Sequence, residues 1–524
     1  MTYDTVVQGG TLVTPEGVVK TDLGIAGETI AAIGPGLTGR QVIDATGKLV
    51  IPGAIDPHVH LQMPAGAWQS SDDWVSGTIA AACGGVTTLI DFVEPTPLPQ
   101  PLPPSRQGEG SLPSPVATGE GQGGGAPSPV ATGEGWGWGL LSALAARRGQ
   151  ADGHAVIDFG LHMTLLDAQP ATLAEIPAVV AAGCPSFKTY MTYSLKLSDD
   201  VLVAAMAAVG RAGGIVMVHA ENDAGIAYLR KLLEAGHVKP RYHPISRPAG
   251  MEAEAVERAL ALAEAAECPV YIVHVSTGRG AAAIAAARSR GQMAFGETCP
   301  QYLLLTDAEF DRPGFEAAKF ICSPPLRKAA DNAALWERLA AADLQTVGTD
   351  HCPFFYIGQK DLGQQDGVYP PFTRIPGGIP GIESRLSLLY TFCVGTGRLS
   401  LERWVEACCT APARIFGLAG RKGALAVGAD ADVVVFDPER EVTLTHGVGA
   451  QDVVAHGHAL LQGATHVYRL HENCDYTPYE GLRLRGWPAL TMLRGQVIAR
   501  DGEFVGQQGY GRFLSRQRQI ASGE

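Results

Sequence analysis

The segment IPGAIDPHVH, residues 51–60, joins a short apolar run to two histidines at its end. Alternate residues of an extended chain face the same side, so His58 and His60 point in one direction and are able to reach one ion. A single His-x-His pair is more often an ordinary pair of core or surface histidines. The residues at the ends of the other predicted strands therefore decide what this pair means.

Eight apolar runs of strand length alternate with Ala-rich helical stretches. Eight β/α units predict an α/β fold, a (β/α)8 TIM barrel over residues 53–417, whose active site forms where the strands end. The runs are Ile51–Asp56, Thr87–Phe92, Val156–His162, Ser186–Met191, Ile215–His219, Val270–Val275, Met293–Thr298 and Leu344–Thr349.

Short strands separated by Gly or Pro occupy the first fifty residues, among them Thr5–Val7 and Thr11–Val13. Similar sequence returns near the other end of the chain. We therefore expect one small β-sandwich built from both chain ends, with residues 1–52 as its first part and 418–500 as its second. Residues 501–524 would form a C-terminal tail.

Two segments interrupt this order. Residues 98–139 contain 11 Gly and 8 Pro, and SPVATGEG occurs twice, at 114–121 and 128–135. Two copies cannot build a solenoid, so we predict a low-complexity insertion that forms an exposed, poorly ordered loop near the active-site face and is dispensable for folding. Residues 446–469 are a possible second insertion. Their His456-Gly457-His458 lacks matching strand-end ligands, and we expect no metal there.

Composition excludes several classes of protein. The formal net charge is −13 and no basic run is dense enough to follow a phosphate backbone, so nucleic acid is not an expected partner. No apolar run approaches the roughly 20 residues that span a bilayer, and the N-terminus has no signal-peptide pattern. We expect a cytoplasmic protein without a membrane partner. The ten cysteines include no Cys-x-x-Cys pair and are predicted to be buried free thiols.

Polar residues end several of the predicted barrel strands. Lys188, His219, His274 and Asp350 join His58 and His60 in this way, and strand ends of one barrel meet at the same edge. Imidazole and carboxylate ligands suit Zn²⁺, Mn²⁺ and similar divalent ions. Lys188 lies in an apolar run, where desolvation lowers the pKa of an amine. Such an amine is able to add carbon dioxide and form a carbamate that bridges two metals.

Six motifs together resemble the dihydropyrimidinase and D-hydantoinase branch of the cyclic amidohydrolases, which act on C–N bonds other than peptide bonds. The resemblance covers nearly the whole chain apart from the two insertions. The motifs are DPHVH (56–60), SFK (186–188), VHAEN (218–222), VHVS (273–276), ETCPQYL (297–303) and GTDHCPF (348–354).

The resemblance implies roles for the matching residues. One metal ion would be held by His58, His60 and Asp350, and the other by His219 and His274. A carboxylated Lys188 and a hydroxide would bridge the two ions, with Zn²⁺ favoured and Mn²⁺ an alternative.

The same resemblance assigns the catalytic and substrate-binding residues. Asp350 would act first as general base and then as general acid, and the Tyr193 hydroxyl would stabilise the oxyanion. Main-chain groups near Ser323 and Gly377 would form hydrogen bonds with the edge of a cyclic ureide. Many relatives have Asn at the position of Gly377. The resemblance also implies a homotetramer.

Substrate class follows from position 62. Relatives that open dihydroorotate place Arg two residues after the His-x-His pair, whereas this chain has Gln62, which favours a neutral ring. We expect hydrolysis of 5,6-dihydropyrimidines, as in pyrimidine catabolism, or of 5-substituted hydantoins, to N-carbamoyl amino acids. An allantoinase-like activity is the nearest alternative. A non-catalytic scaffold relative of the same fold is a second alternative, although such relatives have lost metal ligands and all six candidates are present here.

Overall fold

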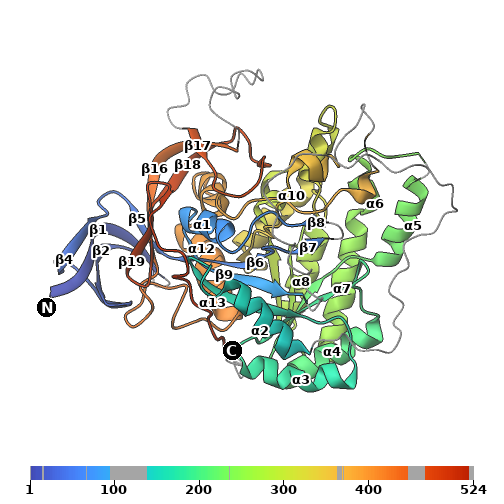
Figure 1. Ribbon diagram of the computed structural model, residues 1–524, viewed down its shortest axis with the longest axis horizontal. Coiled ribbons are helices and arrows are strands. Elements are labelled where there is room, and N and C mark those ends of the chain that lie inside the picture. The colour runs from blue at the N-terminus through green and yellow to red at the C-terminus, as the bar shows by residue number, and fades with distance from the viewer. Residues whose placement is uncertain are drawn as a thin grey trace, which may run out of the picture.

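The computed structural model describes residues 2–14, 17–65, 68–94, 139–234, 236–362, 369, 371–446 and 467–518. Figure 1 shows a barrel surrounded by helices beside a domain of β-strands. The strand domain combines the N-terminal strands, in blue, with C-terminal strands, in orange and red. The barrel consists of the chain between them.

The barrel has eight parallel strands, and each overlaps one of the eight predicted runs. The predicted (β/α)8 fold is therefore confirmed. In sheet order the strands are β15 (Thr346–Val347), β14 (Ala294–Thr298), β13 (Val270–Ile272), β12 (Ile215–His219), β11 (Ser186–Tyr190), β10 (Asp158–Thr164), β9 (Val86–Val93) and β6 (Ala54–Val59).

Main-chain contacts beyond the last strand close the barrel. Val59 bridges His351 in parallel, and the backbone N–H of His60 donates to the carbonyl of His351 at 2.8 Å. Inward-facing residues such as Ile90, Met217 and Tyr271 fill the interior with apolar side chains. The barrel is thus a packed core that leaves its functional groups at one end.

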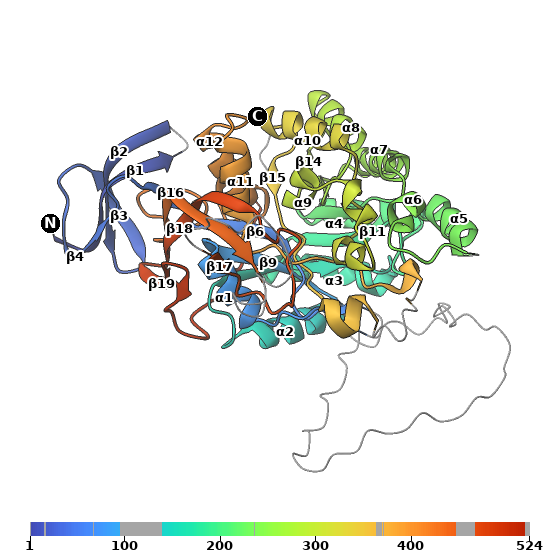
Figure 2. The same ribbon diagram turned by 90° about the horizontal axis from the view of Figure 1, so that it is seen from above.

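Helices surround the strands, as the view in Figure 2 shows. The longer ones are amphipathic or Ala-rich and bury one face against the barrel or, as α5 does, against neighbouring helices. They are α1 (Ser76–Cys83), α2 (Leu140–Ala151), α3 (Pro170–Ala181), α4 (Asp199–Arg211), α5 (Asp223–Glu234), α7 (Ala249–Ala265), α8 (Gly278–Ser289) and α10 (Ala329–Ala340). Shorter helices are α6 (Tyr242–Ser246), α9 (Pro300–Leu304), α11 (Arg385–Leu389), α12 (Leu401–Val405) and α13 (Ala411–Ile415).

Short helical turns and one small hairpin complete the barrel domain. They are η1 (Asp307–Asp311), η2 (Glu316–Phe320), η3 (Tyr356–Lys360), η4 (Phe372–Arg374), η5 (Tyr390–Val394), η6 (Glu406–Thr410), and the hairpin of β7 (Pro64–Ala65) and β8 (Trp68–Gln69). Several of these turns lie in the connections that follow β14 and β15.

The strand domain is one ten-stranded sheet, so the prediction of a β domain built from both chain ends is confirmed. Its central strand β5 (Leu49–Pro52) pairs with β1 (Thr2–Thr14) on one side and β16 (Val433–Thr445) on the other. The remaining strands are β2 (Gly17–Ala26), β3 (Thr29–Gly34), β4 (Thr38–Asp44), β17 (Val467–Arg469), β18 (Arg483–Leu493), β19 (Gln496–Arg500) and β20 (Glu503–Phe504).

One detail of the predicted strands is wrong. The runs Thr5–Val7 and Thr11–Val13 belong to a single strand, β1, and its pairing with β2 shifts register between Val7 and Gly10. Gly9 has φ +71° at this point, a conformation that glycine adopts readily. The glycines therefore form a β-bulge within one strand and do not separate two strands.

Most residues of the two predicted insertions lie outside the described part of the chain. Only Gly139 of residues 98–139 is described, directly before α2. Of residues 446–469, His446 and β17 are described, and β17 pairs with β16. The His456-Gly457-His458 motif lies outside the described residues.

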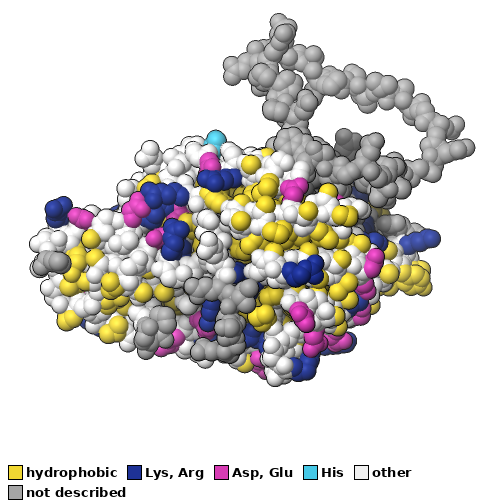
Figure 3. Space-filling model, turned by 90° about the horizontal axis from the view of Figure 1, so that it is seen from below, with side chains coloured by type: hydrophobic (Ala, Val, Ile, Leu, Met, Phe, Trp, Pro, Cys, Tyr) yellow, Lys and Arg dark blue, Asp and Glu magenta, His cyan; other side chains and the backbone are white. Residues whose placement is uncertain are grey.

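The surface of the described chain carries mixed charges. On the face in Figure 3, Lys and Arg side chains are interspersed with Asp and Glu, and hydrophobic side chains gather between them. No helix among the described residues is long and apolar enough to cross a membrane. All ten cysteines are buried and free, as the sequence predicts.

A buried ion cluster joins the two domains. Lys422 Nζ lies 2.7 Å from Asp158 Oδ2 of the barrel strand β10 and 2.7 Å from Asp432 Oδ2 beside the sheet domain. All three side chains are at most 3% exposed. Arg494 also pairs with Asp158. A buried charge without its partner is strongly destabilising, so the domain interface depends on Lys422.

We expect Lys422→Met to lower the free energy of unfolding by about 3–5 kcal/mol, because the buried carboxylate of Asp432 loses its cation. Equilibrium urea unfolding measures this change. Arg421→Ala is the matched control, since Arg421 forms a half-exposed ion pair with Asp430 and should change stability by about 0.5 kcal/mol or less. Equal stability of the Lys422 variant and the control would contradict the proposed interface role.

Candidate active site

The structure brings the six predicted metal-binding residues to one end of the barrel. His58 lies in β6 and His60 follows it, Lys188 lies in β11, and His219 ends β12. His274 and Asp350 lie two and three residues after the ends of the short strands β13 and β15. All six are buried except Asp350, whose side chain is 13% exposed. The parallel strands place these side chains together although they are far apart in the sequence.

The first group is His58, His60 and Asp350. His58 Nε2 and His60 Nε2 are 3.2 Å apart, and Asp350 Oδ1 lies 3.3 Å from each of them. Two atoms that bind one zinc ion at about 2.0–2.2 Å with tetrahedral angles are separated by about 3.3 Å. The three atoms therefore fit around a single divalent ion.

The second group lies beside the first. His274 Nε2 is 2.9 Å from His219 Nδ1, and Lys188 Nζ is 3.5 Å from His58 Nε2. Lys188 thus stands next to the first group and on the same barrel end as the second. This position suits a group that bridges two ions.

Two buried glutamates fix the tautomers of two histidines. Glu297 Oε1 accepts from His58 Nδ1 at 2.7 Å, and Glu221 Oε2 accepts from His219 Nε2 at 2.8 Å. When each glutamate is ionised, the nitrogen that faces the other predicted ligands, Nε2 of His58 and Nδ1 of His219, carries a lone pair. Carboxylate–histidine pairs of this kind are typical of metal sites.

Burial sets the charge of the imidazoles. It lowers the pKa values of His58, His219 and His274, and nearby positive groups such as Lys188 lower them further. These three imidazoles are neutral near pH 7, which is the form that binds metal. The donor set as a whole fits a pair of divalent ions.

Lys188 is 1% exposed and lies among aromatic side chains. Its Nζ is 4.8 Å from the ring centre of Phe92 and 5.3 Å from that of Tyr190. Burial lowers the pKa of Lys188 to about 8, although Asp350 opposes the shift. About a tenth of the amine is therefore unprotonated at pH 7, and this form is nucleophilic.

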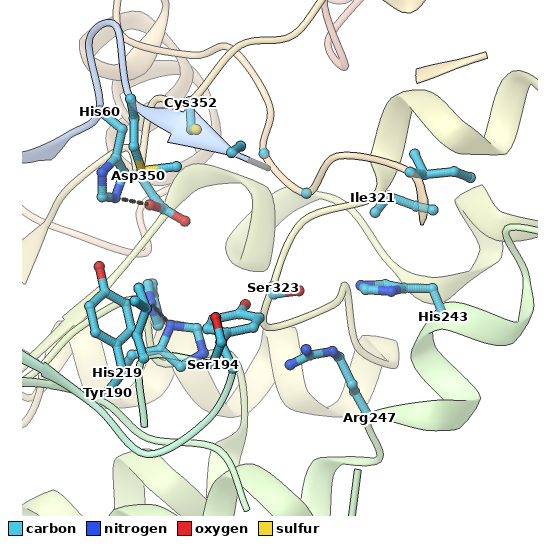
Figure 4. Close-up of a pocket in the computed structure, with 18 of the residues that line it drawn as sticks. His60, Tyr190, Ser194, His219, His243, Arg247, Ile321, Ser323, Asp350 and Cys352 are labelled. Carbon is cyan, nitrogen blue, oxygen red and sulfur yellow. Dashed lines mark hydrogen bonds and ion pairs between the residues drawn. The ribbon is translucent and has the colours of Figure 1, made fainter. Parts of the chain in front are cut away.

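A cavity of about 470 Å³ opens beside these residues, a size typical of small-molecule sites. Figure 4 shows His60 and Asp350 on one side, His219 on the other, and Ser323 farther along toward Arg247 and His243. Tyr193, Ser323 and Gly377, the predicted substrate-binding residues, all line this cavity. The structure thus brings the predicted site residues to this cavity, except for His58, which lies buried directly behind it in contact with His60 and Asp350.

Three site residues have a left-handed backbone. Tyr193, His274 and Asp350 have φ values of +67°, +40° and +53°, which are uncommon for residues other than glycine. Each follows a barrel strand directly or within a few residues. Strained backbone of this kind is concentrated at functional sites, where it aims a side chain.

Tyr193 is held as a hydrogen-bond donor. Burial raises the pKa of Tyr193 to about 12, even though Arg247 opposes the shift. The Arg247 guanidinium lies 5.0 Å from the Tyr193 ring centre and also pairs with Glu221, the partner of His219. Arg247 therefore contacts both the tyrosine and the carboxylate behind a predicted metal ligand.

Sequence reasoning assigned no role to Glu221, Glu297 or Arg247. Glu221 stands two residues after His219, and Glu297 is the last residue but one of β14, so a position at or near a strand end pointed to both. No sequence pattern pointed to Arg247, because it lies in the loop between α6 and α7 and comes close to the site only in the folded chain.

Cys83, Glu383 and His471 form a second group of potential ligands near the sheet domain. Glu383 Oε1 already accepts hydrogen bonds from His471 Nδ1 at 2.8 Å and the Tyr468 hydroxyl at 2.7 Å. Burial raises the pKa of the Cys83 thiol. Because the thiol is protonated and the carboxylate already accepts two hydrogen bonds, we interpret this group as a structural cluster and not as a metal site.

Comparisons with known proteins agree with this site. The amidohydrolase family matches residues 192–498. The D-hydantoinase of Geobacillus stearothermophilus is 39% identical over 98% of this chain and 96% of its own length. Among solved structures, the dihydropyrimidinase of Brevibacillus agri NCHU1002 is 37% identical, with a TM-score of 0.83 over 98% of both chains. The D-hydantoinase of Bacillus sp. AR9 is 38% identical, with a TM-score of 0.83 over 98% of this chain and all of that one.

The chain therefore belongs to the amidohydrolase family. Within the family it belongs to the branch of the dihydropyrimidinases and D-hydantoinases, because these relatives match it over nearly its full length.

We expect Glu297→Gln to weaken metal binding by about 10- to 100-fold, because the amide no longer fixes the His58 tautomer as the carboxylate does. Titration with a chelator, followed by metal analysis, measures this loss. Glu175→Gln is the control, since Glu175 accepts a hydrogen bond from the backbone of Leu141 away from the cavity. Equal resistance of both variants to the chelator would show that Glu297 does not support the site.

Proposed function

We propose that the protein hydrolyses the cyclic amide bond of 5,6-dihydropyrimidines or 5-substituted hydantoins and releases N-carbamoyl amino acids. The observation that carries this proposal is the meeting of six potential metal ligands beside a cavity of small-molecule size. The near full-length similarity to hydantoinases and a dihydropyrimidinase supports it.

We propose that His58, His60 and Asp350 hold one divalent ion and that His219 and His274 hold a second, with a carboxylated Lys188 between them. The histidine-rich donor set favours Zn²⁺, and Mn²⁺ is the alternative. When bound, such an ion pair supplies Lewis acidity, which lowers the pKa of a shared water molecule and polarises the scissile carbonyl.

Asp350 is proposed as the group that moves the proton. It is the most exposed of the six side chains and faces the cavity, so it is able to reach both a bound water and a substrate. It takes a proton from the attacking water and delivers it to the departing ring nitrogen. Its left-handed backbone aims the carboxylate toward His58 and His60.

Tyr193, Ser323 and Gly377 are proposed to hold the substrate. Tyr193 remains protonated near neutral pH and is able to donate to the oxyanion that forms when the carbonyl is attacked. Main-chain groups beside Ser323 and Gly377 would hydrogen-bond the ureide edge of the ring. Gln62, in place of a basic side chain, supports selection of a neutral ring.

A substrate panel tests the proposed function. Protein loaded with Zn²⁺ or Mn²⁺ should hydrolyse dihydrouracil, hydantoin or 5-phenylhydantoin, and should act poorly on allantoin and dihydroorotate. Appearance of the N-carbamoyl product, measured by liquid chromatography, reports the activity. Preferred hydrolysis of allantoin would favour the allantoinase-like alternative. A metal-loaded protein inactive on the whole panel would favour the scaffold alternative.

Lys188→Ala tests the bridging role. We expect it to lose most of the bound metal and the activity, because one bridging ligand is removed, and a short carboxylic acid should restore part of both. Metal analysis and the hydantoin assay measure these effects. Lys196→Ala is the control, since Lys196 is half-exposed and pairs with Asp223 outside the ligand set. Full activity of Lys188→Ala would exclude the carbamate.

The family resemblance also supports a homotetramer, which light scattering coupled to size-exclusion chromatography would measure. The ten buried thiols are consistent with the reducing cytoplasm that we propose as the location.

A further inference from the structure

One buried lysine near the cavity has no part in the proposed chemistry. Lys360 ends the short helical turn η3 and is fully buried. Its Nζ donates to the carbonyl of Ile321 at 2.9 Å and to the carbonyl of Pro376 at 3.0 Å. One side chain thus joins two loops that are 55 residues apart in the chain.

Both carbonyls stand next to proposed substrate-binding positions. Ile321 precedes Ser323 by two residues, and Pro376 directly precedes Gly377. Ile321, Ser323, Gly377 and Gly378 all line the cavity. The amine therefore binds the backbone of both loops at the points where they are proposed to meet the substrate.

Other hydrogen bonds join the two loops to each other or to neighbouring segments. The N–H of Gly378 donates to the carbonyl of Ile321 at 3.0 Å, and the N–H of Cys352 donates to the carbonyl of Ile379 at 3.1 Å. His243 Nε2 donates to the carbonyl of Cys322 at 2.8 Å. The carbonyl of Pro376, by contrast, is held by the Lys360 amine.

The contact does not require a particular charge on the amine. Burial lowers the pKa of Lys360 to about 8. A neutral amine still has two N–H donors, so both bonds are able to form in either protonation state. Placing an amine in the interior carries a desolvation cost, which the two carbonyls offset in part.

We propose that Lys360 is a positioning residue that sets the spacing of the two loops that read the ureide edge of the substrate. The proposal rests on the proposed function of the cavity. Gly377 has no side chain with which to fix its own position, and the Lys360 bond to the carbonyl of Pro376 holds the backbone directly before it. Loss of Lys360 should leave the metal ligands in place, because these lie on or directly after the barrel strands, and should weaken recognition of the ring.

Lys360→Met tests this role, since methionine fills a similar volume without a donor. We expect KM for the best panel substrate to rise about tenfold or more, with kcat changed less and with wild-type metal content. Lys319→Met is the matched control. Lys319 lies 4.6 Å from the ring centre of Tyr356 at the start of η3 and pairs with Glu316, so its loss disturbs the same region but leaves both Lys360 hydrogen bonds in place.

Hydrogen exchange gives a readout that requires no substrate. In Lys360→Met, amide exchange in residues 372–382 should be about tenfold faster than in the wild type, including the Gly378 N–H, while Lys319→Met leaves it unchanged. Lys360→Gln, which keeps a shorter donor, serves as a second variant in case the first fails to fold. It should show the same changes to a smaller extent.

Three results would overturn the proposal. One is an unchanged KM with unchanged exchange in a folded, metal-loaded variant. Another is loss of bound metal, which would place the role of Lys360 at the metal centre. The third is unfolding of both Lys360 variants, which would make the residue a requirement of the whole fold. A wild-type protein inactive on the panel would remove the proposed function, and the exchange experiment would still decide whether Lys360 fixes the loops.

Discussion

Closure of the parallel barrel is the constraint on which the rest of the structure depends. The hydrogen bond from the His60 N–H to the carbonyl of His351 joins the first strand to the segment after the last. This contact places Asp350 within 3.3 Å of His58 and His60, although nearly 300 residues separate them. Because the other strands run parallel between these two, their ends deliver Lys188, His219 and His274 to the same place.

Much of this arrangement was predictable from the sequence. Apolar runs bounded by helical stretches predicted all eight strands, and the polar residues at the ends of five of them predicted which side chains would meet. The prediction was wrong at Gly9 and Gly10. Two glycines between short apolar runs are compatible with a turn between two strands and also with a bulge inside one strand, and the structure has a bulge within β1. The sequence also provided no indication of residues such as Arg247 and Lys360. These residues act through contacts between loops, and the course of a loop does not follow from a periodic sequence pattern.

The site combines groups with different physical tasks. Buried carboxylates behind His58 and His219 fix which ring nitrogen is free, and burial keeps the imidazoles neutral. The same burial lowers the pKa of Lys188 to about 8 and raises that of Tyr193 to about 12. The same buried environment thus favours a reactive Lys188 amine and a Tyr193 hydroxyl that is able to donate a hydrogen bond. On the substrate side, Lys360 and backbone hydrogen bonds are proposed to hold the loops of Ser323 and Gly377.

We propose that these six side chains bind two metal ions bridged through Lys188. Anomalous X-ray diffraction from crystals of the metal-loaded protein, collected at the absorption edge of the bound metal, tests it most directly. We expect two peaks, one among His58, His60 and Asp350 and one beside His219 and His274, with electron density that extends Lys188 Nζ between them. A single peak, or a second peak away from His219 and His274, would contradict it.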